Sequence, residues 1–425
     1  MRRWYLVVVG VLIAGAGLAW VGVPALARVK APIRVGLLHS LTGPMAISER
    51  SMVDAEKLAI DELNEGGGLL GRRVEWVEAD GKSDDRTFAR EAERLITVEK
   101  VSLIVGCWTS ASRKNVKQVV ERFNHLLIYP VAYEGLEQSP RIVYTGAAPN
   151  QQVIPTVKWC HDVLKAKSFF LVGTDTVWPH AVNTIIKDQI KALGAELAGE
   201  EYVELGSEGV GAAVEKMVKA RPDVILSTLE GEVNQPFYKA FRGGQGSKIP
   251  AVTFSMAEDE LRDLPVKQMV NDYAVCNYFQ AIDRPENLAF VGRFKAKYGE
   301  KRVTSDSIAT AYSSIHLWAQ AVREAETAEV SEVRPVLLRQ SRNAPEGVIS
   351  IDRESQHTWR PFFVGRIQGD GRIEIVQTVS KPIRPAPFPF SKTRDEWEEY
   401  LESLSAGWNG NWGAGTSTRS ARSSE

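Results

Sequence analysis

Residues 101–135 read VSLIVGCWTSASRKNVKQVVERFNHLLIYPVAYEG, and this stretch decides the fold. It opens with an apolar run of strand length that ends at Gly106, which is typical of a strand buried on both faces of a parallel sheet. Apolar side chains then recur at helical spacing from Val116 to Phe123, and LLIYP predicts a second buried strand that Pro130 ends. The stretch therefore predicts a β-α-β unit.

The loops that follow these two strands are candidates for a ligand site. The carboxyl ends of parallel strands meet at one edge of a sheet, so residues 107–110 and 129–134 are expected to face the same space. The aromatic and hydroxyl residues of these loops are Trp108, Thr109, Ser110, Tyr129 and Tyr133. Such a set suits a small polar, uncharged ligand, because rings cover its faces while hydroxyls satisfy its donors and acceptors.

Outward from this unit, strands and helices continue to alternate. IRVGLLHS, from residue 33, predicts the first strand, and SFFLVGT, from residue 168, begins a second α/β series. The second series repeats the order of the first at an offset of roughly 120–130 residues, which indicates two similar lobes. Short alternating segments near residues 348–351, 361–367 and 372–378 predict hairpin pieces at a sheet edge.

Composition narrows the class of protein. A chain of 425 residues is long enough for two or three domains. The 52 basic and 53 acidic side chains leave a net charge of -1, so nothing argues for a nucleic-acid partner. Cys107, Cys160 and Cys276 form no CxxC motif and cannot all pair internally, so we expect buried thiols.

No motif of catalysis or cofactor binding is present in the sequence. It contains no HExxH, no G-x-S-x-G, no phosphate-binding Walker loop and no His/Cys group at metal-ligand spacing. Gly66, Gly68 and Gly71 match G-x-G-x-x-G, but here a helix precedes them and a strand follows, the reverse of the dinucleotide fingerprint. We therefore predict no cofactor, no metal and no enzymatic activity.

The two ends of the chain differ from the rest. Arg2 and Arg3 precede an apolar stretch, residues 4–27, that ends in Ala-Leu-Ala, so residues 1–27 are predicted to be a signal peptide or a membrane anchor. The remainder is then exported to the periplasm, either free or tethered to the inner membrane. Residues 381–425 form a Pro-rich and acidic tail with one amphipathic helix, expected to be disordered from Gly407 onward.

Six segments carry a family resemblance that covers residues 33–387: LLHSLTGPMAISERS, ELNEGGGLLGRRVE, GCWTSASRK, YPVAYEG, YTGAAPNQQ and STLEGEVNQPFYKA. In these segments the chain resembles the type I periplasmic binding proteins of the urea and short-chain amide branch. The resemblance implies two doubly wound parallel-sheet lobes joined by three crossovers. The first lobe would comprise residues 33–148 and 277–344, and the second residues 149–276 and 345–380.

The resemblance also implies roles for residues in the first lobe. Trp108 would stack on the ligand, and the Ser110 hydroxyl would hydrogen-bond to it. Tyr129 and Tyr133 would complete this wall, together with main-chain groups near Val131.

In the second lobe the sequence departs from the family pattern. Thr176 and Trp178 stand where that branch has two tyrosines, which changes both the cavity volume and the set of donors and acceptors. Glu230 stands where the branch more often has an uncharged residue, and it could accept from amide N–H groups or pair with a cationic ligand. We include all three as candidate ligand-binding residues.

Three functions are weighed on these grounds. The favoured one is an extracytoplasmic protein that captures urea or a short-chain amide between its lobes and delivers it to an ABC permease. The alternative is a membrane-tethered receptor that senses the same ligand and signals to a partner. An amidohydrolase is the least favoured, because no nucleophile with an orienting base is visible.

Overall fold

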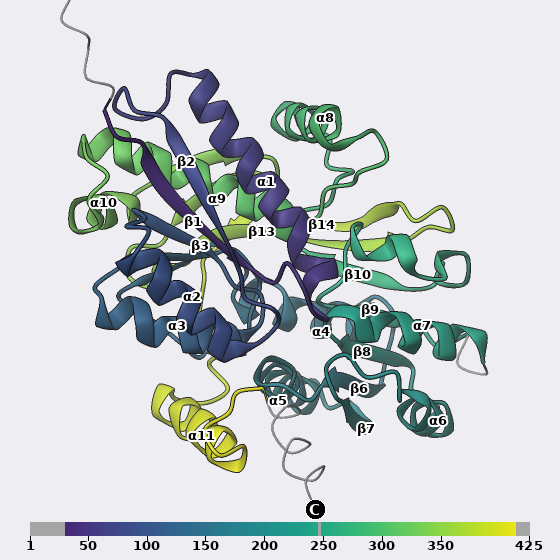
Figure 1. The fold of residues 1–425 in the computed structure, drawn as a ribbon. Coiled ribbons are helices and arrows are strands. Elements are labelled where there is room, and N and C mark those ends of the chain that lie inside the picture. The colour runs from purple at the N-terminus through teal and green to yellow at the C-terminus, as the bar shows by residue number, and fades with distance from the viewer. Residues whose placement is uncertain (1–29, 245–247, 414–425) are drawn as a thin grey trace, which may run out of the picture.

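The computed structural model describes residues 30–244 and 248–413, which form two α/β lobes (Figure 1). The sheet of the first lobe is parallel, with the order β2-β1-β3-β4-β5. Its strands are β1 (Ile33–His39), β2 (Val74–Asp80), β3 (Leu103–Gly106), β4 (Leu127–Tyr129) and β5 (Ile142–Tyr144). The predicted β-α-β unit is confirmed as β3, α3 (Ser110–Arg122) and β4.

Helices cover both faces of this sheet. One face carries α1 (Ala46–Glu65) and α9 (Asp306–Ala325), and the other carries α2 (Asp85–Thr97) and α3 (Figure 1). The strands β3, β4 and β5 are buried along their whole length, as their unbroken apolar runs require. The helices α8 (Pro285–Tyr298) and α10 (Val330–Leu337) pack beside α1 and α9 respectively.

The second lobe has a larger, mixed sheet of order β11-β12-β13-β10-β9-β8-β6-β7, with β14 paired to β13. Its strands are β6 (Ser168–Thr174), β7 (Glu196–Val203), β8 (Val224–Thr228), β9 (Ala251–Thr253), β10 (Tyr273–Cys276), β11 (Ser341–Ala344), β12 (Gly347–Ile351), β13 (Thr358–Ile367) and β14 (Ile373–Ile383). The pairs from β7 to β10 are parallel, and those beyond are antiparallel. The helices α4 (Val153–Asp162) and α5 (Val177–Ala192) pack together, as do α6 (Gly211–Ala220) and α7 (Asn234–Gly243).

The expectation of short hairpin pieces at a sheet edge is wrong for β13. This strand spans 10 residues and lies inside the sheet, because it pairs with β10 through the register Tyr273↔Arg366 to Cys276↔Phe363. Eight of its residues are buried to the degree of a central strand. The short alternating segment did not reveal this, because burial of both faces depends on elements that pack on the sheet from elsewhere in the chain.

Crossover segments join the lobes at the centre of the molecule. Gln151, in the 3-10 turn η1 (Pro149–Gln151), donates from Nε2 to the carbonyls of Thr358 (2.9 Å) and Ile383 (2.7 Å). Asn277 returns a bond from Nδ2 to the Gln151 carbonyl, at 3.1 Å. These hydrogen bonds tie the segments that connect the lobes to one another.

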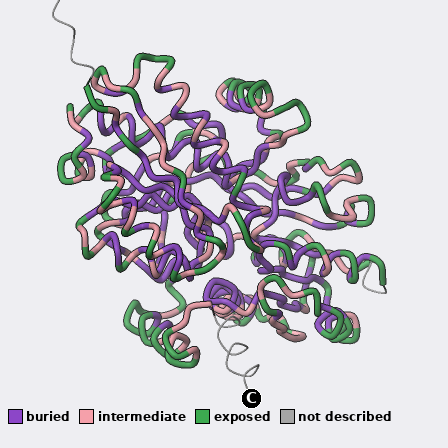
Figure 2. The backbone as a smooth tube through the Cα atoms, in the orientation of Figure 1, coloured by how far each residue is buried: buried purple, intermediate pink, exposed green. Residues whose placement is uncertain are grey.

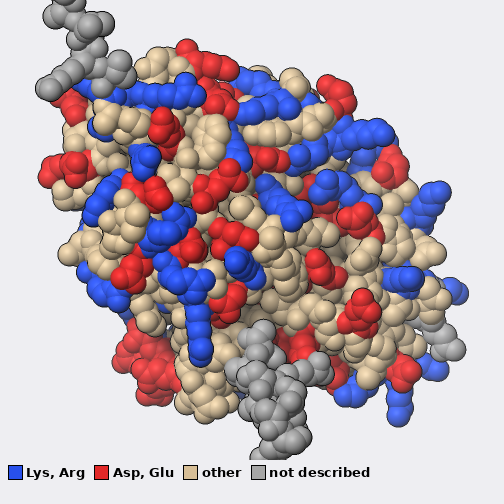
Figure 3. Space-filling view, in the orientation of Figure 1, with Lys and Arg blue, Asp and Glu red and all other residues tan. Residues whose placement is uncertain are grey.

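The core follows the two sheets, and the charges are spread over the surface. Buried residues trace the strands and the inner faces of the helices (Figure 2), while basic and acidic side chains are interspersed over the visible face (Figure 3). No helix within residues 30–244 and 248–413 is long and apolar enough to cross a membrane. The apolar stretch predicted to be a signal peptide or anchor lies outside the described residues.

The C-terminal tail is docked on the folded lobes. Its helix α11 (Arg394–Gly407) buries Trp397 completely, and the Tyr400 hydroxyl donates to the His180 carbonyl of α5 at 3.0 Å. Trp412 accepts at its carbonyl from the Val177 amide of α5 (3.3 Å), and Lys114 of α3 lies 4.8 Å from its ring. The tail thus contacts both lobes as far as residue 413, and residues 414–425 lie outside the described part.

Candidate functional site

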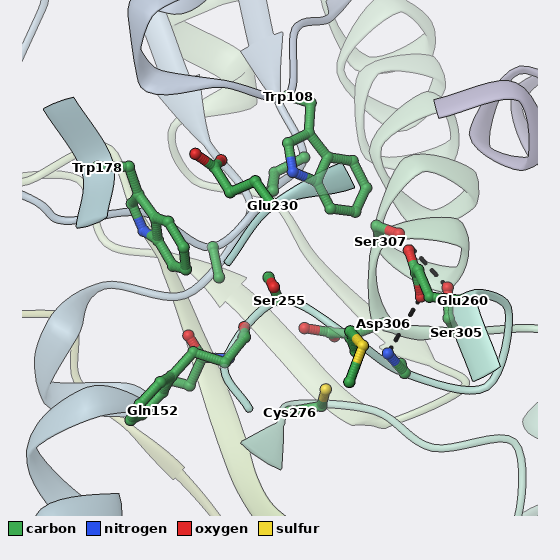
Figure 4. Close-up of a pocket in the computed structure, with 15 residues that line it drawn as sticks. Trp108, Gln152, Trp178, Glu230, Ser255, Glu260, Cys276, Ser305, Asp306 and Ser307 are labelled. Atoms are coloured by element: carbon green, nitrogen blue, oxygen red, sulfur yellow. Dashed lines mark hydrogen bonds between the residues drawn. The ribbon is translucent and has the colours of Figure 1, made fainter. Parts of the chain in front are cut away.

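A cavity lies between the lobes at the carboxyl ends of β3, β4, β8, β9 and β10, which is where parallel sheets place their ligands (Figure 4). The volume of this cavity is about 40 Å³. Four of the predicted site residues line it: Trp108, Val131, Trp178 and Glu230. Two of these come from the first lobe and two from the second, so the walls oppose each other across the cavity.

The first-lobe wall begins at a sharp bend after β3. Gly106 has a φ of +149°, and a Cβ at this position would collide with the Leu38 carbonyl of the neighbouring strand. Cys107 follows with a φ of +66°, which turns Trp108 away from the strand direction. The Tyr129 hydroxyl then donates to the Trp108 carbonyl at 2.5 Å and fixes the loop that presents the indole.

A fully buried arginine stabilises this wall from behind. Arg113, on the first turn of α3, donates to Glu134 (2.9 Å) and to Glu137 (3.0 Å). Lys114 adds a contact to Glu137 at 3.2 Å. Burial raises the pKa of Glu137, but Arg113 and Lys114 outweigh it and hold that pKa well below the ordinary value. The network is therefore charged and internally paired.

The other predicted first-lobe residues belong to this network and do not line the cavity. The Ser110 hydroxyl donates to Glu134 and accepts from Arg113 Nη1 at 2.9 Å. The rings of Tyr129 and Tyr133 lie 4.8 and 4.4 Å from the Arg113 guanidinium. In the closed arrangement of the lobes these three side chains position the wall, while Trp108 and Val131 form its surface.

The second-lobe wall carries a buried carboxyl group that has no cationic partner among the described residues. Glu230 follows β8 and is 3% exposed, and its Oε2 accepts from the hydroxyls of Thr174 (3.1 Å) and Thr176 (2.9 Å). Burial raises the pKa of Glu230 to about 7, although both hydroxyls lower it. Thr176 does not line the cavity itself; its hydroxyl supports Glu230, and it immediately precedes α5, which presents Trp178.

Further carboxylates reach the cavity from segments that sequence reasoning missed. The lining residues not predicted are Ala132, Gln152, Phe254, Ser255, Met256, Ala257, Glu260, Cys276, Ser305, Asp306 and Ser307. Burial raises the pKa of Glu260 and of Asp306, and Arg360 compensates Asp306 through an ion pair of 2.9 Å. Residues 254–257 follow an apolar strand, so they could have been predicted from the rule that ligands bind at the carboxyl ends of parallel strands. No local sequence pattern indicated that Glu260 or Asp306 would line the cavity.

The lobes touch directly beside the cavity. The Glu232 amide donates to the Pro44 carbonyl at 3.2 Å, across the gap between the lobes. Gly231 has a φ of +63°, and a Cβ there would lie 2.7 Å from the same carbonyl oxygen, so the close approach depends on glycine. The two lobes are therefore in direct contact at this edge of the cavity.

Neither metal nor thiol chemistry is indicated at this site. No group of three or more His, Cys, Asp and Glu side chains within the described residues could hold a metal ion. The prediction of buried thiols is confirmed, because Cys107, Cys160 and Cys276 are all free and buried. Burial raises the pKa of the Cys276 thiol, which keeps it neutral beside the cavity.

Two opposed parallel-sheet lobes that close on a small cavity define a solute-binding protein. Residues 33–394 match the family described as "Periplasmic binding protein domain". The chain is 31% identical over 381 residues to the Leu/Ile/Val-binding protein homolog 7 of Brucella melitensis, covering 82% of this chain and 92% of that protein. It is 22% identical over 355 residues to the leucine-, isoleucine-, valine-, threonine- and alanine-binding protein of Pseudomonas aeruginosa, with coverages of 80% and 91%.

Solved structures share the fold. The branched-chain amino acid transporter substrate-binding protein LivJ of Streptococcus pneumoniae, in complex with isoleucine, has a TM-score of 0.73 at 22% identity, covering 82% of this chain and 99% of that one. A solute-binding protein of an ABC transporter from Rhodopseudomonas palustris, in complex with 3,4-dihydroxybenzoic acid, has a TM-score of 0.75 at 21% identity, with coverages of 83% and 99%.

The chain belongs to the periplasmic binding protein family. Its fold is that of the type I members, and proteins of this family act outside the cytoplasm. Proteins of this kind are not enzymes, so the expectation of no enzymatic activity is confirmed. The α/β fold with two parallel-sheet lobes is confirmed as well.

Proposed function

We propose that this protein captures a small planar compound rich in N–H donors, of the urea and short-chain amide class, and delivers it to an ABC permease. The observation that carries the proposal is the lining of the cavity. Two indole rings, Trp108 and Trp178, offer faces for stacking, and Glu230, Glu260 and Asp306 offer acceptor oxygens. A flat ligand that donates from its edges matches such a set.

The cavity suits the benzoates poorly, and its small size weighs against leucine and isoleucine. A benzoate carries a carboxylate, yet no described residue in the lining is Lys, Arg or His, so burying it beside Glu230 would be costly. Leucine and isoleucine bring an ammonium group that can pair with Glu230, so only the size of the cavity weighs against them. The small volume of the cavity, about 40 Å³, also supports a ligand of few atoms.

The first-lobe motifs GCWTS and YPVAYEG, which resemble the urea and amide branch, support the same class. Delivery to a permease fits the family better than signalling, since none of the relatives described above is named as a receptor that signals. Within this proposal the lobes are residues 33–148 with 277–344 and residues 149–276 with 345–380, except that β11 (Ser341–Ala344) and the end of β14 belong to the sheet of the second lobe. A tether at the N-terminus would concern only where the protein acts.

Calorimetric titration of the mature protein tests the proposal. The panel contains urea, formamide and acetamide, the cations guanidinium and acetamidinium, which have the same shapes as urea and acetamide, and leucine and benzoate for comparison. We expect binding by at least one planar nitrogen compound below millimolar concentration, and weaker or no binding by leucine and benzoate. Tight binding of leucine or benzoate, with no heat from the planar compounds, would contradict it.

A further inference from the structure

The cavity has an unbalanced charge that a neutral ligand leaves in place. Of its three carboxylates, Asp306 has an ion pair with Arg360, whereas Glu230 and Glu260 have none among the residues that the structure describes. Glu230 is 3% exposed and Glu260 is 7% exposed, so solvent does little to compensate them. A buried carboxylate of this kind is stable only if it takes up a proton or gains a cation.

The donors already present do not supply that cation. Glu230 receives two hydroxyl hydrogen bonds on the same oxygen, Oε2, from Thr174 and Thr176. Its Oε1 has no hydrogen bond from a described residue, and the side chain lines the cavity. The unfilled acceptor capacity of Glu230 therefore belongs to the ligand.

The rings make the site selective among cations. Glu230 stands between the indoles of Trp108 and Trp178 in the view of Figure 4. An indole face attracts a cation, and it attracts a flat delocalised one most readily, because such a cation stacks on the ring and is weakly hydrated. An ammonium group is compact and strongly hydrated, so it would lose more on entering this small cavity.

Resting on the function proposed above, we propose that the preferred ligand is a planar cation, a small amidinium or guanidinium compound, whose charge is recognised by Glu230 and whose faces are covered by Trp108 and Trp178. In this arrangement two N–H groups of the cation point at the Glu230 carboxylate. The free N–H groups on the opposite edge face the acceptors of the cavity floor, including Glu260. A neutral ligand of the same shape fills the same space but brings no charge, so Glu230 and Glu260 then depend on protons for compensation.

Pairs of compounds with the same shape and different charge give the sharpest test. Acetamide and acetamidinium differ only in an oxygen replaced by an NH₂ group with one positive charge, and urea and guanidinium differ in the same way. Calorimetric titration at pH 8 and constant ionic strength is expected to give acetamidinium and guanidinium dissociation constants at least tenfold below those of their neutral counterparts. Methylammonium, a cation without a plane, is expected to bind more weakly than acetamidinium.

Two variants assign the effect to Glu230. Glu230→Gln keeps the size and removes the charge, so it is expected to abolish the preference for the cations while acetamide binds within about threefold of its original strength. Glu232→Gln removes the same charge two residues away, from an exposed side chain outside the cavity, and is expected to change nothing. Thermal unfolding of both variants checks that they fold.

The outcomes separate the two proposals. Equal or tighter binding of the neutral member of each pair would overturn the preference for a planar cation and leave the proposed function standing. Unchanged preference in Glu230→Gln would overturn the role of Glu230. Failure of all the planar compounds to bind would overturn the proposed function itself. The comparison of paired compounds uses the unaltered protein, so it decides the question even if a variant does not fold.

Discussion

The two walls of the cavity handle buried charge in opposite ways. In the first-lobe wall, Arg113 lies between Glu134 and Glu137, so every buried charge has a partner within the protein. In the second-lobe wall, Glu230 has two hydroxyl donors and no cation. A paired network fixes geometry, whereas an unpaired carboxylate is available to a ligand. The first wall is therefore held in shape by its own ion pairs, whereas the second leaves an acceptor group available at the cavity.

The largest effect is expected from breaking the paired wall. Arg113→Ala removes the ion-pair partner that Glu134 and Glu137 share and leaves only Lys114 near these two buried carboxylates, so the free energy of unfolding should fall by about 3–5 kcal/mol. Differential scanning calorimetry is the suitable measurement, because urea and guanidinium are themselves candidate ligands. Arg122→Ala, on the exposed side of the same helix, is the control and should change stability by less than about 0.5 kcal/mol. Equal effects of the two variants would contradict the difference between buried and exposed pairs.

The next largest effect is expected on ligand affinity, when the Trp108 ring at the surface of the first wall is removed. Trp108→Ala removes the stacking ring but leaves the Arg113 network in place, so ligand affinity should fall by about 2 kcal/mol or more, roughly thirtyfold. Calorimetric titration with acetamidinium or the best neutral ligand measures it. Trp76→Ala, a half-buried tryptophan on β2, should leave affinity unchanged. A folded Trp108→Ala protein with full affinity would remove Trp108 from the site.

The affinity for a cationic ligand is expected to depend on pH through Glu230 of the second wall. The pKa of Glu230 is raised to about 7, so below pH 7 its carboxyl holds a proton that a cationic ligand must displace. The affinity for acetamidinium should therefore rise between pH 6 and pH 8, by at most about tenfold per pH unit, and should level off above the pKa. The same titration in Glu230→Gln should show a shallower rise. An affinity that falls with pH would contradict the assignment.

Two other carboxylates near Glu230 are paired within the protein. The nearby carboxylates are Glu134, paired with Arg113, and Glu49, paired with His39 at 3.4 Å. Burial lowers the pKa of His39, but Glu56 and Glu49 raise it to about 10, so this cation persists through pH 8. Glu260, with a pKa raised by burial, is the second carboxylate of the cavity expected to contribute.

The smallest effect on ligand affinity is expected from removing the Thr176 hydroxyl, which donates to Glu230. Thr176→Val removes the hydroxyl that donates to Oε2 at 2.9 Å while keeping the shape of the side chain. The loss of one hydrogen bond to a carboxylate should weaken cation binding by about 1 kcal/mol, roughly fivefold, and should raise the pKa of Glu230 further. Titration at pH 8 checks the affinity. An affinity change larger than that of Trp108→Ala would show that Thr176 contacts the ligand itself.

The sequence predicted the fold well because buried parallel strands carry a strong local signal. The apolar runs of β3, β4, β6 and β8 and the Trp108 loop were all read from their own residues. The position of β13 could not be predicted in this way, because its pairing with β10 joins segments about ninety residues apart, in the register Tyr273↔Arg366.

The site was predictable only in part, for a related reason. Trp108, Val131, Trp178 and Glu230 follow strands, and their strand ends meet at one edge. Ser110, Tyr129 and Tyr133 also follow strands, but the side chain of Arg113 draws them into a buried network. An arginine on a helix ordinarily indicates a solvated face, so nothing in the sequence revealed that its partners would turn away from the cavity.

A crystal structure of the protein with acetamidinium, or with the tightest neutral ligand found, tests the central claim most directly. The account predicts one ligand molecule between the rings of Trp108 and Trp178, with N–H groups directed at the carboxylate of Glu230 within hydrogen-bonding distance. A ligand bound elsewhere, or one seated in the cavity with Glu230 turned away from it, would contradict the account.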